Sequence, residues 1–356
     1  MKKVLLTVLL LSAAVMLSVS VTGAQSGLVY GYISPGPDTW YQRTVDGFSF
    51  GAERDGVEVV VLNSEYSVEK ELENIDALIN LGVDGIGMFS FNESGARIAA
   101  ERANEAGIPL VTVDAVGSVL AAGVPLVAEI DFDWYSMGVS YADWMAENYP
   151  GERFVILTGN FEGIPSQRIN AGMTERAAEL GVNELVGIYD TDYNPATAVN
   201  VAQDLVQSGE EFGIMFVMDE DMAAAVIRML ENEGLLNDPI KVIAQNGSPA
   251  GIPLLQEGKL LYTISSSPGW EGLVAYLALH NNVIGHSDEM NQHFILPVIP
   301  VNEDNVDDPH IVVPWSPVPV YWEVTYQYFP QLLEYDPEFM AEIAAITPTL
   351  EPSSGS

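Results

Sequence analysis

From Leu28 onward, short runs of β-branched and aliphatic residues alternate with segments whose apolar residues recur every three or four positions. The short runs are typical of buried strands, and the longer segments are typical of amphipathic helices. In the first third of the chain, strands are predicted at residues 28–33, 57–62, 85–89 and 108–113, with helices near 41–54, 68–81 and 94–106. This alternation predicts a doubly wound α/β lobe, a parallel sheet with helices on both faces.

The same rhythm restarts after Asp114. Strands are predicted at residues 154–157, 185–189, 213–217 and 240–244, with helices near 166–180, 196–207 and 221–233. Two further strands, 261–265 and 295–301, flank a helix near 270–283. We therefore expect a second α/β lobe of similar build, with a late piece of chain returning to the first lobe and several strands joining the two.

The N-terminus resembles a targeting signal, because Lys2 and Lys3 precede an apolar run, residues 4–21, that ends in small residues. We predict a signal peptide over residues 1–24; a membrane anchor is the alternative. The C-terminal residues 302–319 are rich in proline and acids, and aromatic residues follow. These aromatics are expected to pack on the second lobe, or otherwise to form a partner-binding patch.

The charge narrows the choice of partners. Thirteen Lys and Arg stand against 50 Asp and Glu, a formal charge of −37 that repels nucleic acid and anionic lipid surfaces. We attribute this acidity to solubility or to a saline or acidic habitat rather than to the ligand, so the net charge says little about which ligand binds. The chain contains no cysteine, which rules out a disulfide and a lipid-modified cysteine. We expect a monomer, periplasmic or secreted, that is neither lipid-anchored nor inserted in a membrane after signal cleavage.

Candidate site residues follow from sheet geometry, since ligands of open parallel sheets bind beyond the carboxyl ends of the strands. The residues there are Ser34, Asp38, Trp40, Tyr41, Asp114, Asn160, Tyr193, Asp219 and Asn246. Aromatic rings can stack on the C–H face of a sugar while Asp and Asn bind its hydroxyls. Packing of Trp40 and Tyr41 on the sheet, and capping or loop roles for Asp114 and Asp219, are the alternatives.

The sequence offers few residues that could form an enzyme active site. The four histidines lie late in the chain, outside the strand-end set, and no cysteine is present to act as a nucleophile or zinc ligand. Glycine-rich phosphate-binding motifs are also missing. We therefore expect no enzyme activity, no cofactor and no metal.

Several segments resemble those of a known family. They are WYQRTVDG at 40–47, VLNS at 61–64, AGIPLVTVD at 106–114, FVMDEDMA at 216–223 and EGKL at 257–260. In this order and spacing, residues 27–306 resemble the type I periplasmic binding proteins, most closely the ribose-binding-like sugar-binding subunits of ABC transporters. The resemblance implies two Rossmann-like lobes joined by a three-strand hinge, with crossovers near residues 130–131, 265–266 and 297–298.

The resemblance also implies lobe boundaries. The first lobe would comprise residues 25–130 plus 267–297, and the second would comprise residues 131–266 plus 298–346. From their composition, residues 347–356 are expected to form a disordered tail. Its implied function is capture of a sugar or polyol between the lobes and delivery to an ABC transporter permease. A periplasmic sensor that presents a sugar-like or autoinducer-type ligand to a receptor is the alternative.

Some site residues match the family and others depart from it. The resemblance assigns ring stacking to Trp40, Tyr41 and Tyr193 and hydroxyl binding to Asp114. Asp219 and Asn246 stand where the family usually has Asn and Asp. Three further positions bear on specificity: Ala115 replaces the arginine of ribose binders, Arg168 lies one residue further from Gly172 than the usual arginine, and Ser266 replaces a hinge glutamine.

Overall fold

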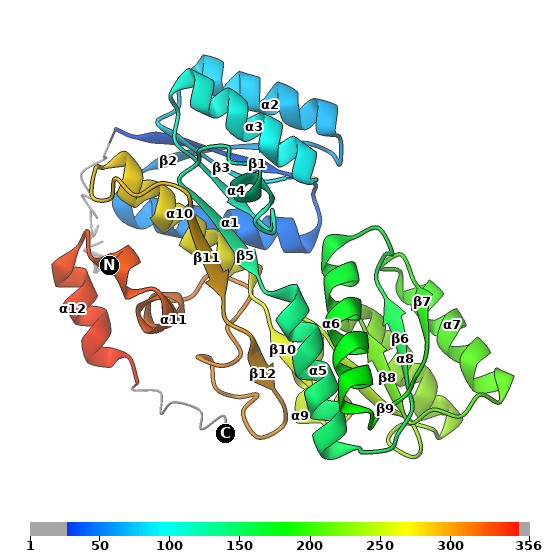
Figure 1. The fold of residues 1–356 in the computed structure, drawn as a ribbon. Coiled ribbons are helices and arrows are strands. Elements are labelled where there is room, and N and C mark those ends of the chain that lie inside the picture. The colour runs from blue at the N-terminus through cyan, green and yellow to red at the C-terminus, as the bar shows by residue number, and fades with distance from the viewer. Residues whose placement is uncertain (1–26, 91, 349–356) are drawn as a thin grey trace, which may run out of the picture.

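The computed structural model describes residues 27–90 and 92–348. The expected signal peptide and all but the first two residues of the expected tail lie outside the described residues. The chain forms two α/β lobes, with the C-terminal helices beside the first lobe (Figure 1).

The first lobe is built on a six-stranded parallel sheet in the order β11-β5-β4-β3-β1-β2. Its strands are β1 (Val29–Ser34), β2 (Glu58–Asn63), β3 (Gly85–Phe89), β4 (Leu110–Val113), β5 (Ala128–Phe132) and β11 (Gln292–Leu296). Helices α2 (Val68–Leu81), α3 (Glu93–Ala106) and α4 (Ser118–Ala121) cover one face, and α1 (Thr39–Asp55) and α10 (Pro268–Val283) cover the other. The predicted doubly wound build is confirmed for this lobe.

The second lobe is built on a four-stranded parallel sheet in the order β7-β6-β8-β9. Its strands are β6 (Phe154–Thr158), β7 (Leu185–Asp190), β8 (Ile214–Val217) and β9 (Lys241–Ala244). Helices α5 (Trp134–Asn148) and α6 (Ile164–Leu180) pack together on one face, and α7 (Pro195–Ser208) and α8 (Glu220–Glu233) on the other, with the short α9 (Gly251–Gln256) beside α8.

Glycines end the first three helices where the sequence suggested. Gly56, Gly82 and Gly107 each follow a helix in the left-handed region, with φ between 66° and 72°. In each case the glycine N–H donates to carbonyls of the last helical turn, which have no partner within the helix. A side chain at these positions would strain the backbone, so glycine fixes where each helix stops.

Within residues 29–301 the chain passes between the lobes at three places. One lies between β5 and α5, one between β10 (Thr263–Ser265) and α10, and one between β11 and β12 (Ile299–Val301). Strands β10 and β12 pair antiparallel beside the lobe junction. The single strand expected over residues 295–301 is therefore two short strands with different partners, separated at Pro297, which lacks the N–H that a continuous ladder needs.

The expectation that the C-terminal aromatics pack on the second lobe is wrong. Helix α11 (Val320–Tyr328), the 3₁₀ helix η1 (Pro330–Leu333) and α12 (Pro337–Ile346) pack on the first lobe, against α1 and α10. Trp322 stacks on Phe50 with 5.4 Å between ring centroids, and Phe329 lies 5.9 Å from Trp270. The physical reason is that α1 and α10 carry apolar rings on their outer sides, and these would face water without this cover.

Helices α1 and α10 approach each other closely because glycines face each other across the contact. A β-carbon built at Gly47 would lie 1.7 Å from the carbonyl oxygen of Gly269, and one at Gly272 would lie 2.0 Å from that of Thr44. Both contacts are to backbone, which cannot rotate out of the way. This helix pair therefore depends on the absence of side chains at these positions.

We expect Gly47→Ala to lower the free energy of unfolding by about 1–3 kcal/mol or more, because α1 and α10 must separate to admit the methyl group. Gly163→Ala is the matched control, since its β-carbon would meet no atom closer than 3.6 Å and its backbone is extended. Urea denaturation of both variants measures the difference. Equal stability of the two would show that the helix contact is not tight.

Candidate ligand-binding site

The loops after β1 and β2 are tied together at the rim of the first lobe. Asp38 caps α1 by accepting a hydrogen bond from the Tyr41 N–H at 3.2 Å, and its second oxygen accepts from the Tyr66 hydroxyl at 3.1 Å. The Tyr66 ring lies over Gly36, where a β-carbon would be only 2.1 Å from the ring. Asp38 therefore caps the N-terminus of α1. Its side chain is also exposed at the rim of the lobe.

Four aromatic side chains, which we call the aromatic cluster, gather beside this rim: Trp40, Phe132, Trp134 and Trp315. Trp40 is half-buried and lies 5.3 Å from Trp315 at an interplanar angle of 90°. Its ring is also 6.1 Å from Phe132 and 6.2 Å from Trp134. Since edge-to-face contacts hold aromatic rings at defined tilts, Trp40 has a fixed orientation at the lobe junction.

Asp114 lies next to the aromatic cluster. Its backbone is left-handed, with φ of 54°, and its Oδ1 accepts a hydrogen bond from the Trp134 indole N–H at 3.1 Å. Burial and the nearby Asp131 carboxylate raise the pKa of Asp114 to about 8. The group is therefore mostly protonated at neutral pH, so it can donate a hydrogen bond as well as accept one.

At the facing rim, Asp219, Asn246 and Ser266 form a chain of polar groups that runs from α8 to the lobe junction. Asp219 caps α8 through Oδ1, which accepts from the N–H groups of Asp221 and Met222. Its Oδ2 lies 3.4 Å from the Asn246 amide nitrogen, and the Asn246 oxygen lies 3.4 Å from the Ser266 hydroxyl. Burial raises the pKa of Asp219 to about 6.

Tyr193 comes from the loop after β7 and faces the first lobe. Its ring lies over Gly159, its hydroxyl is 3.3 Å from the Ser166 hydroxyl, and 46% of the residue is exposed. Partial burial is the main cause of the raised pKa of Tyr193, and Asp219 and Asp114 add to it. Asp114 belongs to the first lobe, so its effect on the pKa of Tyr193 indicates that the two rims lie near each other.

Two predicted residues do not join these groups. Arg168 is exposed on α6, and its side chain makes no hydrogen bond or ion pair with another described residue. Asn160 joins two loops: its oxygen accepts from the Glu162 N–H in its own loop after β6, and its amide donates to Asp192 in the loop after β7. A ligand contact by Arg168 stays a prediction, whereas Asn160 serves to hold these loops.

The sequence analysis missed three members of the aromatic cluster. Phe132 is the last residue of β5, and Trp134 follows two residues later at the start of α5. Both lie at the carboxyl end of a strand that the sequence does not predict, so the search of strand ends does not include them. Trp315 lies in the proline-rich C-terminal segment, and no local pattern there signals that it reaches Trp40.

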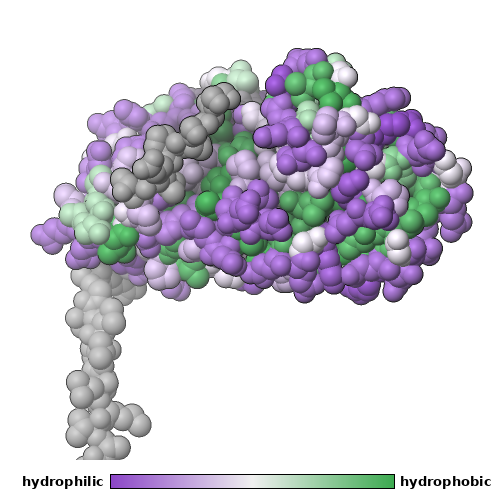
Figure 2. Space-filling model, turned by 90° about the horizontal axis from the view of Figure 1, so that it is seen from below, coloured by the Kyte–Doolittle hydropathy of each residue, from purple (hydrophilic) through white to green (hydrophobic). Residues whose placement is uncertain are grey.

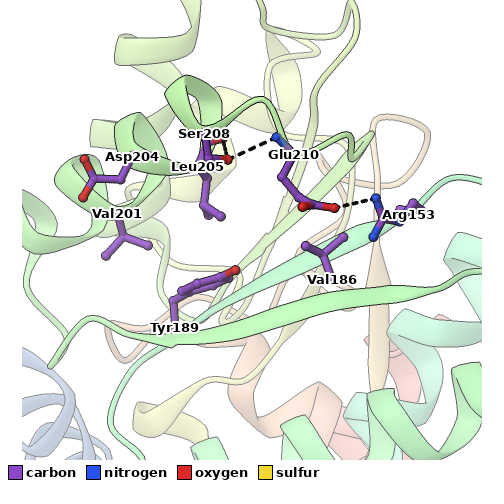
Figure 3. A pocket seen from close by; sticks show the side chains of 8 residues that line it. All are labelled: Arg153, Val186, Tyr189, Val201, Asp204, Leu205, Ser208 and Glu210. Carbon is purple, nitrogen blue, oxygen red and sulfur yellow. Dashed lines mark hydrogen bonds and ion pairs between the residues drawn. The ribbon is translucent and has the colours of Figure 1, made fainter.

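A pocket of about 630 Å³ lies elsewhere, between β7 and α7 (Figure 3). Apolar side chains of Val186, Val201 and Leu205 line it, and the Arg153–Glu210 ion pair, 2.7 Å long, borders it. Arg153 precedes β6 and Glu210 follows α7, so the pocket lies toward the amino ends of the strands. It is therefore separate from the candidate site at the carboxyl ends.

Two doubly wound lobes, three connections and facing polar rims define a two-lobed solute-binding protein. Comparison with known proteins agrees, because residues 30–287 match the family described as periplasmic binding protein domain. The chain belongs to this family, which confirms the predicted fold class. Members of the family are binding proteins, so this chain is a binding protein and not an enzyme.

Characterised relatives are distant but extend over most of the chain. The ribose import binding protein RbsB of Salmonella typhimurium is 24% identical over 75% of this chain and 88% of its own length. A xylitol-binding protein of Mycolicibacterium smegmatis is 24% identical over 74% of this chain and 73% of its own. A solute-binding protein of Bacillus halodurans, solved with myo-inositol, superposes with a TM-score of 0.70 at 19% identity, covering 81% of this chain and 98% of that one.

The surface is largely hydrophilic, in keeping with the many charged residues of the chain. On the face seen in Figure 2, hydrophilic residues cover most of the surface and hydrophobic residues lie in smaller groups between them. Among residues 27–90 and 92–348, no helix is long and apolar enough to cross a bilayer. In the same part of the chain, His, Asp and Glu form no group of three or more able to hold a metal ion.

We expect Asp114 to make folding stability fall as the pH rises from about 4 to 8. The unfolded pKa is about 3.9 and the folded pKa is about 8. The folded chain therefore keeps a proton that the unfolded chain has released, and this stabilisation is lost as the pH passes through 8. Asp114→Asn cannot ionise but keeps an acceptor for Trp134. Between pH 5 and 8, the melting temperature of this variant should therefore fall less than that of the parent. The two decreases should differ by at least about 2 °C.

Thermal melts at both pH values test this, with the exposed Asp288→Asn as a control for the removal of one surface carboxylate. If Asp114→Asn and Asp288→Asn lose the same stability between pH 5 and 8, Asp114 is already ionised in the folded protein at neutral pH. Burial then does not raise its pKa.

Proposed function

We propose that this protein captures a neutral sugar or polyol between its two lobes and delivers it to the permease of an ABC transporter. The observation that carries the proposal is the aromatic cluster beside Asp114 on one rim, faced by Asp219 and Asn246 on the other. The relatives named as ribose-binding and xylitol-binding proteins, each 24% identical to this chain, support the same ligand class.

The chemistry of the rims favours a neutral, hydroxyl-rich ligand. A ring such as Trp40 can stack on the C–H face of a sugar, while the carboxyl and amide groups bind its hydroxyls. An anionic ligand would meet Asp38, Asp114 and Asp219, with Arg168 as the one predicted cationic partner. Protonated Asp114 supplies a donor as well as acceptors, which suits hydroxyls because each of them also both donates and accepts.

We further propose that the protein is exported and carries no lipid anchor. The predicted signal segment supports export, and the absence of cysteine excludes a lipid-modified cysteine. N-terminal sequencing of the secreted chain would find a start near Gln25; an intact Met1 in the membrane fraction would instead indicate an anchor.

Identification of the ligand is the first experiment. Mass spectrometry of material released from the purified protein, followed by calorimetry with the identified compound, tests the ligand class directly. A thermal-shift screen over pentoses, hexoses, xylitol and inositols replaces it if the protein purifies empty. Binding of amino acids or phosphorylated compounds in place of neutral polyols would overturn the proposal.

Substitutions on the two rims should weaken binding without unfolding the lobes. We expect Trp40→Ala to weaken it about ten- to a hundredfold through lost stacking, a loss of roughly 1–3 kcal/mol. Asp114→Ala should weaken it by about tenfold or more. Asp219→Ser is the sharper test of the second lobe, because serine can still cap α8 while losing the oxygen beside Asn246.

Calorimetry on these variants, with Asp288→Ala as an exposed control, distinguishes ligand binding from structural support. Parent-like affinity in both Asp114→Ala and Asp219→Ser would place the ligand elsewhere. Loss of the folded state in either variant would mean that the carboxyl group is mainly structural.

Ligand binding should also bring the lobes closer. A ligand that contacts both rims binds the closed state more tightly and shifts the population toward it. We expect the radius of gyration from small-angle scattering to decrease at saturating ligand, and Trp40→Ala to show the same decrease only at higher ligand concentration. A profile independent of ligand would rule out a hinged closure.

A further inference from the structure

The C-terminal segment, residues 302–348, crosses between the lobes beside the hinge. Near its start, Asp307 accepts a hydrogen bond from Gln256, which ends α9 of the second lobe, at 2.7 Å. A few residues later the Val313 N–H donates to the Ser265 hydroxyl at 3.1 Å, and the Pro314 carbonyl accepts from the Ser267 hydroxyl at 2.6 Å. Ser265 and Ser267 flank the connection from β10 to α10, so the segment is a fourth link between the lobes.

This link ends at Trp315. Among the rings of the aromatic cluster, that of Trp315 lies nearest to the ring of Trp40. Trp315 is 9% exposed, and its indole N–H has no hydrogen-bond partner among the described residues. Its backbone is held close to α10, because a β-carbon at Gly269 would lie 2.4 Å from the Trp315 carbonyl oxygen. Trp315 therefore has little freedom to move away from Trp40.

Beyond Trp315 the segment is fastened to the first lobe. The Arg54 guanidinium lies 3.8 Å from the centre of the Phe339 ring and forms an ion pair with Asp336. Tyr335 donates to Asp55 at 2.9 Å, next to Arg54 in α1. Trp315 is thus fixed by the hinge contacts on one side and by these contacts with α1 on the other.

The segment also lies outside residues 30–287, which match the family. Trp315 therefore comes from a part of the chain beyond the residues that the family model matches.

We propose that Trp315 is a specificity-determining positioning residue of the ligand site. Its perpendicular contact fixes the tilt of the Trp40 ring, and its indole fills the space beside that ring on the hinge side. This inference rests on the proposed function, in which Trp40 stacks on the ligand. A ligand with one small ring then fits against a rigid Trp40, while bulkier ligands meet Trp315 or its neighbours.

The test compares Trp315→Ala with Trp315→Phe, which keeps a ring, and with Trp322→Ala as the matched control. Trp322 belongs to the same segment and is similarly buried, at 6% exposed, but packs on Phe50 and Phe339 away from Trp40. Calorimetry uses the tightest-binding compound among ribose, xylitol and myo-inositol, and a disaccharide of glucose as the bulky probe. Thermal melts of each variant without ligand report the folded state separately.

We expect Trp315→Ala to bind the small probe about tenfold more weakly and to discriminate less against the disaccharide. Trp315→Phe should recover most of the affinity, and Trp322→Ala should melt at a lower temperature while binding like the parent. If Trp315→Ala does not fold, Trp315→Leu keeps the apolar volume without a ring and should show the same loss of affinity.

Parent-like affinity and selectivity in a folded Trp315→Ala or Trp315→Leu protein would overturn the role of Trp315 and leave the proposed function intact. Equal losses in Trp315→Ala and Trp322→Ala would also overturn it, because they would show only a general effect of the segment. A parent protein that binds no sugar or polyol would instead refute the proposed function, and this inference with it.

Discussion

The candidate site depends on the burial of α10 between the first sheet, α1 and the C-terminal segment. Fourteen consecutive residues of α10, Pro268 to Asn281, are buried. A helix that is apolar on all sides is stable only when every side is covered, and here three different parts of the chain cover it. Because α10 starts directly after the connection that follows β10, its packing also fixes where the hinge enters the first lobe.

This packing determines the geometry at the lobe junction. The close contact of Gly47 with Gly269 places the start of α10 against α1, whose first turn carries Trp40 and Tyr41. Ser267 caps α10 and also binds Pro314, so the same few residues place the helix, the hinge and the segment that ends in Trp315. A change in the α1–α10 contact would therefore move the aromatic cluster as well as weaken the core.

Electrostatics act locally here, in contrast to the formal charge of −37. Burial is the main cause of the raised pKa values of Asp114 and Asp219, and the neighbouring carboxylates Asp131 and Asp221 add to it. The rims are therefore less negative than the sequence implies, which suits the proposed neutral ligand. The formal charge therefore does not describe the site, where burial sets the protonation of the carboxyl groups.

The sequence alone determined the two α/β lobes, most helix ends and many of the rim residues, because periodicity, glycine stops and strand ends depend on neighbours in the chain. It also indicated Trp40, Asp114 and Asp219. Only the tertiary structure decided that the C-terminal aromatics cover the first lobe, that strand 295–301 divides at Pro297, and that Trp315 meets Trp40. Those outcomes depend on contacts between residues far apart in the sequence, such as Trp40 and Trp315, which are 275 positions apart, and no local pattern encodes such contacts.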